Sequence, residues 1–211
     1  MEDNKEHLQA LSDIRSMMER SSRFISLSGL SGIFAGIFAL IGAYYANWYI
    51  YSHVKVFLYS RHCVSCEIIK MYWPLIIDAI IVLGSSLFVG TLLTIRNSKK
   101  RGIKIWDSTS KRLLINLMIP LASGGIFCLI LLYHGLVGLV APVTLIFYGL
   151  ALINASKYTL NDIRYLGIME IILGLISSVF IGYGLVCWAI GFGVLHIIYG
   201  AIMYFKYEKK N

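Results

Sequence analysis

The chain has 211 residues, of which 58% are hydrophobic and 14% are charged, and its mean hydropathy is +0.73. A water-soluble domain needs more polar surface than this, so the composition excludes an ordinary soluble protein. The formal net charge of +8 is concentrated between the apolar runs. This distribution indicates membrane topology and contact with anionic lipid headgroups, and no nucleic-acid partner is expected.

The first 23 residues are predicted to form an amphipathic helix on the cytoplasmic face of the membrane. Asp3 and Glu6 have the spacing of a capping box, and apolar residues follow at helical intervals at Leu8, Leu11, Ile14 and Met18. A helix packed beneath a membrane bundle would have the same pattern, so both interpretations stay open. The segment is too charged for a secretory signal.

Six apolar runs follow, and each is long enough to cross a bilayer as a helix. We therefore predict an all-α polytopic membrane protein with six transmembrane helices arranged as three hairpins. The predicted spans are residues 24–45, 73–95, 113–133, 136–154, 165–183 and 185–204. The corresponding domains are an amphipathic helix (1–23), a transmembrane domain (24–204) and a basic cytoplasmic tail (205–211).

The distribution of positive charge fixes the orientation of these spans. The segment from Arg96 to Arg112 holds seven Lys or Arg residues and one acid, Asp107. Short basic loops stay in the cytoplasm, and with this loop inside, 16 of the 19 Lys and Arg residues fall on the cytoplasmic side. We predict a bacterial inner-membrane protein with both termini cytoplasmic, whose basic loop contacts anionic lipid headgroups.

The largest predicted outer loop, residues 46–72, contains the pair Cys63 and Cys66, with His62 beside the first thiol. Two thiols at this spacing on an oxidising face can form a disulfide, and a neighbouring histidine favours the reactive thiolate. The pair could also join His53 and His62 in binding zinc or copper. A structural disulfide or free thiols, a redox pair and a metal site all remain open.

An ionisable side chain inside a transmembrane span costs free energy, so a functional role is the default interpretation of such a residue. Asp78, Glu170 and His196 are the three residues of this kind. Glu170 lies 14 residues before Gly184 and His196 lies 12 residues after it, so a tight hairpin places them within about 3 Å of the same depth. Both share helix faces with small residues, Gly167, Gly174 and Ser177 on span five and Gly193 and Gly200 on span six. We expect the glycines at 174, 193 and 200 to let these two helices approach each other closely.

We predict that Glu170 and His196 face each other across this hairpin, either as a polar clasp or as a proton-relay or ligand site. Asp78 lies near the outer end of span two, where it would either anchor the helix at the interface or support a site. Tyr199, one turn beyond His196, is a further supporting candidate.

Three resemblances to known families accompany these patterns. The stretch Arg15–Phe24, followed by Ser26–Gly32, and the end Gly193–Gly200 resemble an uncharacterised family of six-span bacterial inner-membrane proteins. Residues Leu166–Gly174 resemble HdeD-type acid-stress proteins in their pattern of glycine and apolar residues, and those proteins also have six short spans in hairpins. The Cys63–Cys66 loop is similar in position to that of DsbB-like thiol oxidases, but those have a second outer cysteine pair, whereas Cys128 and Cys187 fall within spans here.

Templates for nucleotide binding, metalloprotease and serine hydrolase chemistry are absent from the sequence. This absence favours a non-enzymatic protein, either a small transporter or channel or a membrane stress or sensing component. An outer-face thiol–disulfide oxidoreductase using Cys63 and Cys66, or a scaffold for a cytoplasmic partner, are the alternatives. No metal or cofactor is assigned, and a homo-oligomer is left open.

Overall fold

The computed structural model describes residues 28–54, 65–100, 102 and 106–208, and side chains are described outside residues 54 and 65–71. Within these ranges the chain is helical and contains no β-strand. The α-helices are α2 (Gly29–Tyr49), α4 (Ser65–Lys100), α5 (Ser108–Tyr133), α6 (Val140–Ala155), α7 (Asp162–Val179), α8 (Gly184–Trp188) and α9 (His196–Met203).

Shorter helical segments extend or connect these helices. The 3₁₀ turns are η2 (Val137–Leu139), η3 (Ser156–Tyr158) and η4 (Ile181–Tyr183), and the π-helical segments are η1 (Ile50–Val54), η5 (Ala189–Leu195) and η6 (Tyr204–Glu208). As a result, α8, η5, α9 and η6 follow one another without a break and form one long final helix with two π segments.

Five helical segments among the described residues are long and apolar enough to cross a membrane. They are Gly29–His53, Tyr72–Lys100, Ser108–Tyr133, Val137–Tyr158 and Ile181–Glu208. The remaining long helix, α7, has 18 residues that include Asp162, Arg164 and Glu170. The prediction of an all-helical protein is confirmed, and the five segments fit a membrane-embedded protein, whereas the sixth span and the hairpin pairing stay predictions.

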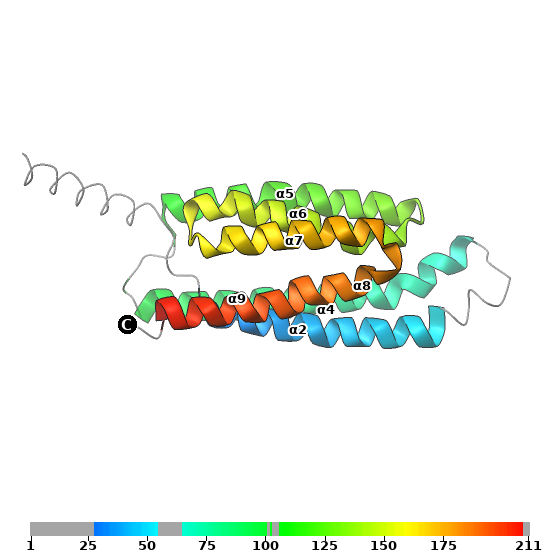
Figure 1. Ribbon diagram of the computed structural model, residues 1–211, viewed down its shortest axis with the longest axis horizontal. Helices are drawn as coiled ribbons and strands as arrows, with labels where there is room; N and C mark the ends of the chain where they lie inside the picture. Colours follow the sequence, from blue (N-terminus) through cyan, green and yellow to red (C-terminus); the bar gives the residue numbers. More distant parts are fainter. Residues whose placement is uncertain (1–27, 55–64, 101, 103–105, 209–211) are drawn as a thin grey trace, which may run out of the picture.

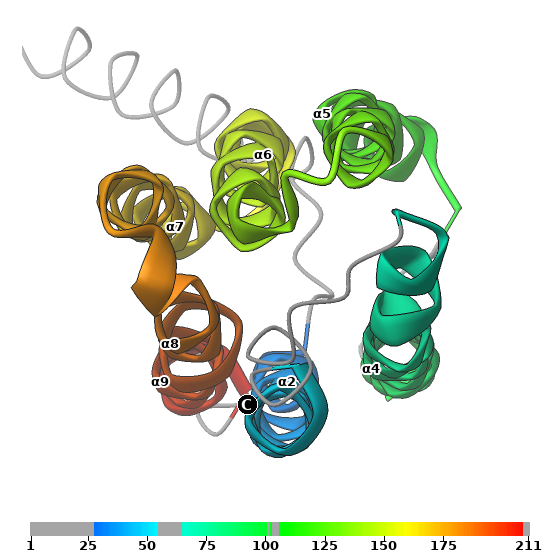
Figure 2. The same ribbon diagram turned by 90° about the vertical axis from the view of Figure 1, so that its right-hand side faces the viewer.

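The helices form two layers. One layer contains α5, α6 and α7, and the other contains α4, α2 and the long final helix (Figures 1 and 2). Contacts between the layers run mainly from α6 and α7 to α8, η5 and α9. We call this contact region the interlayer interface.

Glycines hold the helices of each layer close together. In one layer, Gly149 of α6 and Gly167 of α7 face each other so closely that a Cβ on Gly149 would lie 2.5 Å from the Gly167 carbonyl oxygen. In the other layer, a Cβ on Gly200 would lie 2.7 Å from the carbonyl oxygen of Gly29 in α2. Small residues allow this approach of two backbones, which is a usual device of helix packing in membranes.

Local signals at the helix ends explain two of the turns. Gly135 has a φ of +73° and follows α5, and the amides of Gly135 and Leu136 donate to the carbonyls of Leu132 and Leu131 at 3.0 and 2.8 Å. This hydrogen-bond pattern is a Schellman motif, which needs a residue in the left-handed region and so favours glycine.

At the start of α5, the Asp107 carboxylate accepts hydrogen bonds from the backbone amide and the hydroxyl of Ser110, both at 2.7 Å. These bonds cap the helix and lower the pKa of Asp107 below its usual value of 3.8.

Several predicted boundaries differ from those of the structure. Helical geometry continues to Val54 after α2 and resumes at Ser65 in α4, so much of the predicted outer loop 46–72 is helical. Pro74 lies inside α4, and the first part of this helix bends away from the rest (Figure 1). The predicted basic loop is likewise shortened, because α4 continues to Lys100 and α5 begins at Ser108. Sequence hydropathy located the apolar cores of these helices and missed their polar ends.

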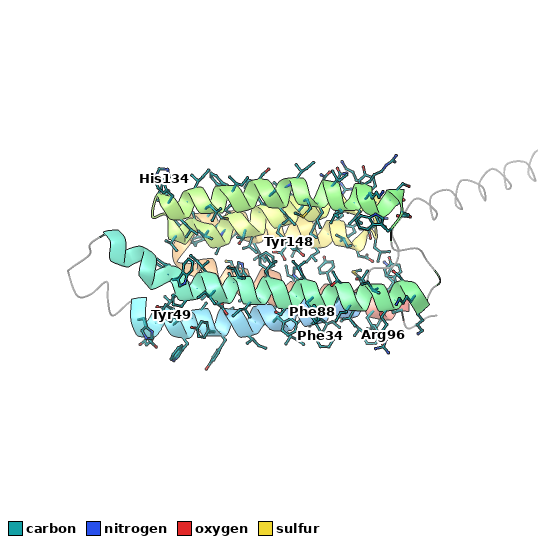
Figure 3. The ribbon with its side chains drawn as sticks, turned by 180° about the vertical axis from the view of Figure 1, so that it is seen from behind. Phe34, Tyr49, Phe88, Arg96, His134 and Tyr148 are labelled. Atoms are coloured by element: carbon teal, nitrogen blue, oxygen red, sulfur yellow. The ribbon has the colours of Figure 1, made fainter. Side chains whose placement is uncertain are left out.

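The two ends of the bundle carry different residues. Arg96 lies near one end, where α4 finishes, and Tyr49 and His134 lie at the opposite end (Figure 3). The final helix ends, at Glu208, on the same side of the bundle as the end of α4 (Figure 1). The predicted tail at 205–211 is helical as far as Glu208, since η6 continues the final helix.

Candidate functional site

Glu170, in the middle of α7, is the most deeply buried ionisable side chain that the structure describes, with an exposed fraction of 0%. Neither carboxyl oxygen has a hydrogen-bond partner among the described residues. The imidazole of His196 lies beside it, with Nδ1 3.5 Å from Oε1, beyond a normal hydrogen bond. Glu170 is therefore held beside a polar group without being bonded to it.

His196 begins α9, directly after the π-helical segment η5, and is also buried. Its Nδ1 lies 3.0 Å from the carbonyl oxygen of Gly191, and its Nε2 lies 2.8 Å from the hydroxyl oxygen of Tyr148. A carbonyl only accepts hydrogen bonds, so Nδ1 carries a proton. In the neutral imidazole, Nε2 is then the acceptor for the Tyr148 hydroxyl.

Tyr148 of α6 completes the contact between the layers, and Figure 3 places it between them. Its ring centroid lies 5.4 Å from that of His196 and 4.8 Å from that of Phe192, and the Phe192 and His196 rings are stacked. The rings of Tyr148 and Phe192 come from different layers, and both lie against the imidazole. They keep His196 in a fixed orientation toward Glu170.

Gly191, in η5, provides the space for the Glu170 carboxyl. A Cβ at this position would collide with Oε2 of Glu170 and would lie 2.6 Å from Cδ2 of Leu145. Leu145 itself has an exposed fraction of 0%. The carboxyl is thus enclosed by the backbone of Gly191, the side chain of Leu145 and the imidazole of His196.

The structure brings Glu170 and His196 together, but not through the glycines named for that purpose. Gly174 of α7 faces α6, where a Cβ would lie 2.6 Å from Cγ1 of Ile146. Gly193 faces Leu40 of α2, and Gly200 faces Gly29 of the same helix. The assignment of these glycines to the interface between the fifth and sixth spans is therefore wrong, because each of the two helices packs mainly within its own layer.

Sequence reasoning missed Tyr148 and Gly191. Tyr148 lies 48 residues before His196, so no local spacing connects them, although a single tyrosine beside Gly149 in an apolar run was a signal. Gly191 lies in a short Gly-Phe-Gly stretch that matches no binding motif. Its role depends on the π segment, which turns residue 191 toward α7, and regular helical periodicity does not predict such a segment.

The other candidates lie apart from this cluster. Asp78 is half-buried where α4 meets Gly42 of α2, whose Cβ would come 3.3 Å from its Oδ2. Tyr199 packs against an apolar cluster consisting of Leu152, Leu160, Ile163, Leu166 and Met203. Cys128 and Cys187 are free thiols. The predicted supporting roles of Asp78 and Tyr199 stay predictions.

The predicted outer thiol site lies largely outside the described residues. His62 and Cys63 are not described, and Cys66 is described only as a backbone position in α4. The amphipathic helix predicted at 1–23 also lies outside the described part. His53, the fourth member of the predicted metal set, belongs to η1 and stacks on Tyr49 with a centroid distance of 4.7 Å.

A second polar contact joins α7 to the final helix at the end of the bundle. Lys206 Nζ donates to both carboxylate oxygens of Asp162, at 3.0 and 3.1 Å, and the Tyr207 hydroxyl donates to the same carboxylate at 2.9 Å. This cluster is partly exposed. The apolar cluster around Leu166 separates it from Glu170.

The chemistry available at the buried cluster is proton transfer. Among the described residues, no three His, Cys, Asp or Glu side chains gather, so Glu170 and His196 could offer a metal ion only two protein ligands. A carboxyl and an imidazole 3.5 Å apart can instead exchange or share a proton, with Tyr148 as a further hydroxyl in the chain.

Comparison with known proteins adds no family to this description. No protein-family profile, no curated protein and no solved structure matches the chain. The resemblances drawn from short stretches of sequence therefore stay predictions.

Proposed function

We propose that this chain is a six-span, non-enzymatic membrane protein in which Glu170 and His196 form a protonation site for transport or for sensing. The observation that carries the proposal is the fully buried Glu170 carboxyl, which lacks a hydrogen-bond donor. A bare carboxylate is very costly inside a membrane, so the occluded arrangement suits a neutral acid beside a neutral imidazole. Ionisation of Glu170 then favours a different arrangement of the two layers.

The packing of the bundle supports a change of this kind. Close glycine contacts hold α6 against α7 and the final helix against α2, whereas the layers meet at a polar cluster that is incompletely bonded. A two-state element whose equilibrium depends on one protonation event is what a proton-linked transporter or an acid sensor requires. The two layers are the parts of the structure that would move relative to each other.

The proposed orientation places the Arg96 end of the bundle in the cytoplasm of a bacterial inner membrane, with both termini on that side. The exposed basic residues at the ends of α4 and α5 would then contact anionic lipid headgroups. Reporter fusions at His134 and Lys104 should report opposite sides of the membrane. Fusions that report the same side would contradict this topology.

The function is tested by following the protonation of Glu170 directly. Infrared difference spectra of the reconstituted protein, recorded between roughly pH 5 and pH 8, should contain a carboxylic-acid carbonyl band that disappears in Glu170→Gln. Tyr148→Phe should keep the band and shift its midpoint, because it removes the hydrogen bond to Nε2 of His196. Spectra of wild type and Glu170→Gln that are identical throughout this range would refute the proposal.

Proton flux distinguishes the two forms of the function. In liposomes with an internal pH indicator and an imposed pH gradient, a transporter or channel should accelerate dissipation of the gradient, and Glu170→Gln should abolish the acceleration. A sensor should show the infrared band without flux.

A further inference from the structure

The interlayer interface is built differently on the two sides of Glu170. Toward the end where α7 joins α8, the next inward-facing polar group on α7 is Ser177, two turns away and also 0% exposed. Its hydroxyl has no hydrogen-bond partner among the described residues. Two polar side chains on one buried face of α7 thus lack partners.

The surroundings on this side are small around Gly184, although nearer Glu170 a Cβ on Gly174 would lie 2.6 Å from Cγ1 of Ile146. A Cβ on Gly184 would lie at ordinary contact distances, 3.6 to 3.8 Å, from Ala141, Gly138 and Pro142. Small side chains make few dispersion contacts, so little attraction is lost when the helices separate slightly. A hydroxyl in such a gap would give entering water a hydrogen-bond partner.

Large apolar side chains close the opposite side. Leu152, Leu160, Ile163, Leu166 and Met203 pack together between Glu170 and the Asp162–Lys206 contact, and each is less than a tenth exposed. A water path on this side would have to expose several of these apolar side chains, which the hydrophobic effect opposes. A water path through this apolar cluster is therefore much more costly than one past Ser177.

We infer that Glu170 exchanges its proton with water from one membrane face only, the face at which α7 joins α8, through a path that passes Ser177. In each cycle the carboxylate takes one proton from water in the path and returns one to it, and no electrons are transferred. The ionisable groups of the Glu170 cluster are His196 on the final helix and Tyr148 on α6. Cys187 is a buried thiol on α8. The inference rests on the proposed function.

Cysteine labelling tests the route in full-length protein. In a background with Cys63, Cys66, Cys128 and Cys187 replaced by alanine, Ser177→Cys is treated with a membrane-impermeant sulfonated methanethiosulfonate, which reacts with thiolates. In vesicles of known orientation, labelling should be at least about tenfold faster from the α7–α8 face than from the other face, because a thiolate forms only where water reaches it.

Two variants serve as matched controls. Ile176→Cys is adjacent to Ser177 on the outer surface of α7, where the side chain is 47% exposed and would face lipid, so it should stay unlabelled from either face. Leu166→Cys, within the apolar cluster, should also stay unlabelled from both faces. Retaining native Cys187, with the other three replaced, gives a second reporter that leaves the interface unchanged if Ser177→Cys does not fold.

Labelling of Leu166→Cys from the Arg96 face, or no labelling of either reporter at position 177 or 187, would overturn the inferred route. Either result would leave the infrared band of Glu170 unaffected. Loss of that band, in contrast, would reject the proposed function itself, so the two failures are distinguishable.

Discussion

The final helix touches α7 through two carboxylates that differ in almost every respect. Asp162, at the partly exposed end, accepts hydrogen bonds from Lys206 and Tyr207 at normal distances. Glu170, at the centre of the bundle, is fully buried and has no hydrogen bond to its neighbour His196. The carboxyl group with the more complete hydrogen bonds, Asp162, is thus the more exposed one, where an unpaired polar group would cost less.

This difference shows that bond geometry and energetic importance are separate properties. An exposed ion pair contributes about 0–1 kcal/mol even with good geometry, because water and salt screen it. A buried polar group has no water to replace a lost partner, so removing that partner leaves the whole desolvation cost uncompensated. We expect the incompletely bonded Glu170 contact to dominate both stability and response to pH.

The largest expected effect comes from removing the imidazole. His196→Leu should lower the free energy of unfolding by about 3 kcal/mol, because Glu170 and Tyr148 both lose their polar neighbour. Adding Glu170→Gln should restore part of the loss. Unfolding titrations with sodium dodecyl sulfate in mixed micelles measure the single and double variants, and strictly additive losses would mean that the two residues do not interact.

Filling the space beside Glu170 should have the next largest effect. Gly191→Ala should cost about 2 kcal/mol, since the new Cβ collides with Oε2 and meets Leu145 at 2.6 Å. The matched control is Gly125→Ala in α5, where no atom lies within 4 Å of the added Cβ. Equal stabilities of the two variants would contradict the described packing around the carboxyl.

Asp107 differs from both Asp162 and Glu170, because its carboxylate accepts hydrogen bonds from the helix that it caps and not from another helix. Asp107→Ala should destabilise the protein by about 1 kcal/mol, the usual effect of losing a helix cap. The pKa of Asp107 is lowered in the folded protein, so its ionic contribution is complete above about pH 4 and is lost as the pH falls through the lowered value.

Asp107→Asn should keep most of the cap and remove this acid dependence. Thermal melts of the three proteins at low and neutral pH measure both effects. An acid dependence that persists in the asparagine variant would assign it to another group.

The smallest effect is expected at the exposed end. Lys206→Gln should change stability by less than about 1 kcal/mol, and the change should shrink as salt is added. Lys157→Gln, an exposed lysine on η3, removes the same charge as a control. A loss at Lys206 as large as that in His196→Leu would break the contrast between the two contacts.

The sequence predicted the helices better than it predicted their partners. Apolar runs located the ends of α5 and α6 to within about one residue and their starts to within about five, because hydrophobicity is a local property. Counting from Gly184 also placed Glu170 and His196 at one depth. That count worked although the two helices belong to different layers, because depth depends on distance along the chain and not on which helices touch.

Tyr148 and Gly191 needed information that is not local. Tyr148 reaches His196 only because α6 packs beside α7, and this pairing depends on which glycine faces which helix. The glycine stripes indicated close packing but were compatible with several partners. Gly191 faces Glu170 because η5 departs from regular α-helical spacing, and a sequence contains no strong signal for a π segment.

The composition of α7 also has a consequence for how the protein is made. Membrane insertion machinery samples each segment against lipid as it emerges, and an acidic or basic residue at the centre of a helix disfavours entry by about 3 kcal/mol. In the proposed six-span topology, α7 carries Asp162, Arg164 and Glu170 in 18 residues and would enter poorly as an isolated segment. Its glycine contact with α6 and the later synthesis of His196 would then compensate for these charges. For that topology we expect ordered biogenesis, in which α6 is already in place when α7 enters. A chain that stops after Val179 would then present the Glu170 carboxyl without its partner to the quality-control proteases of the membrane.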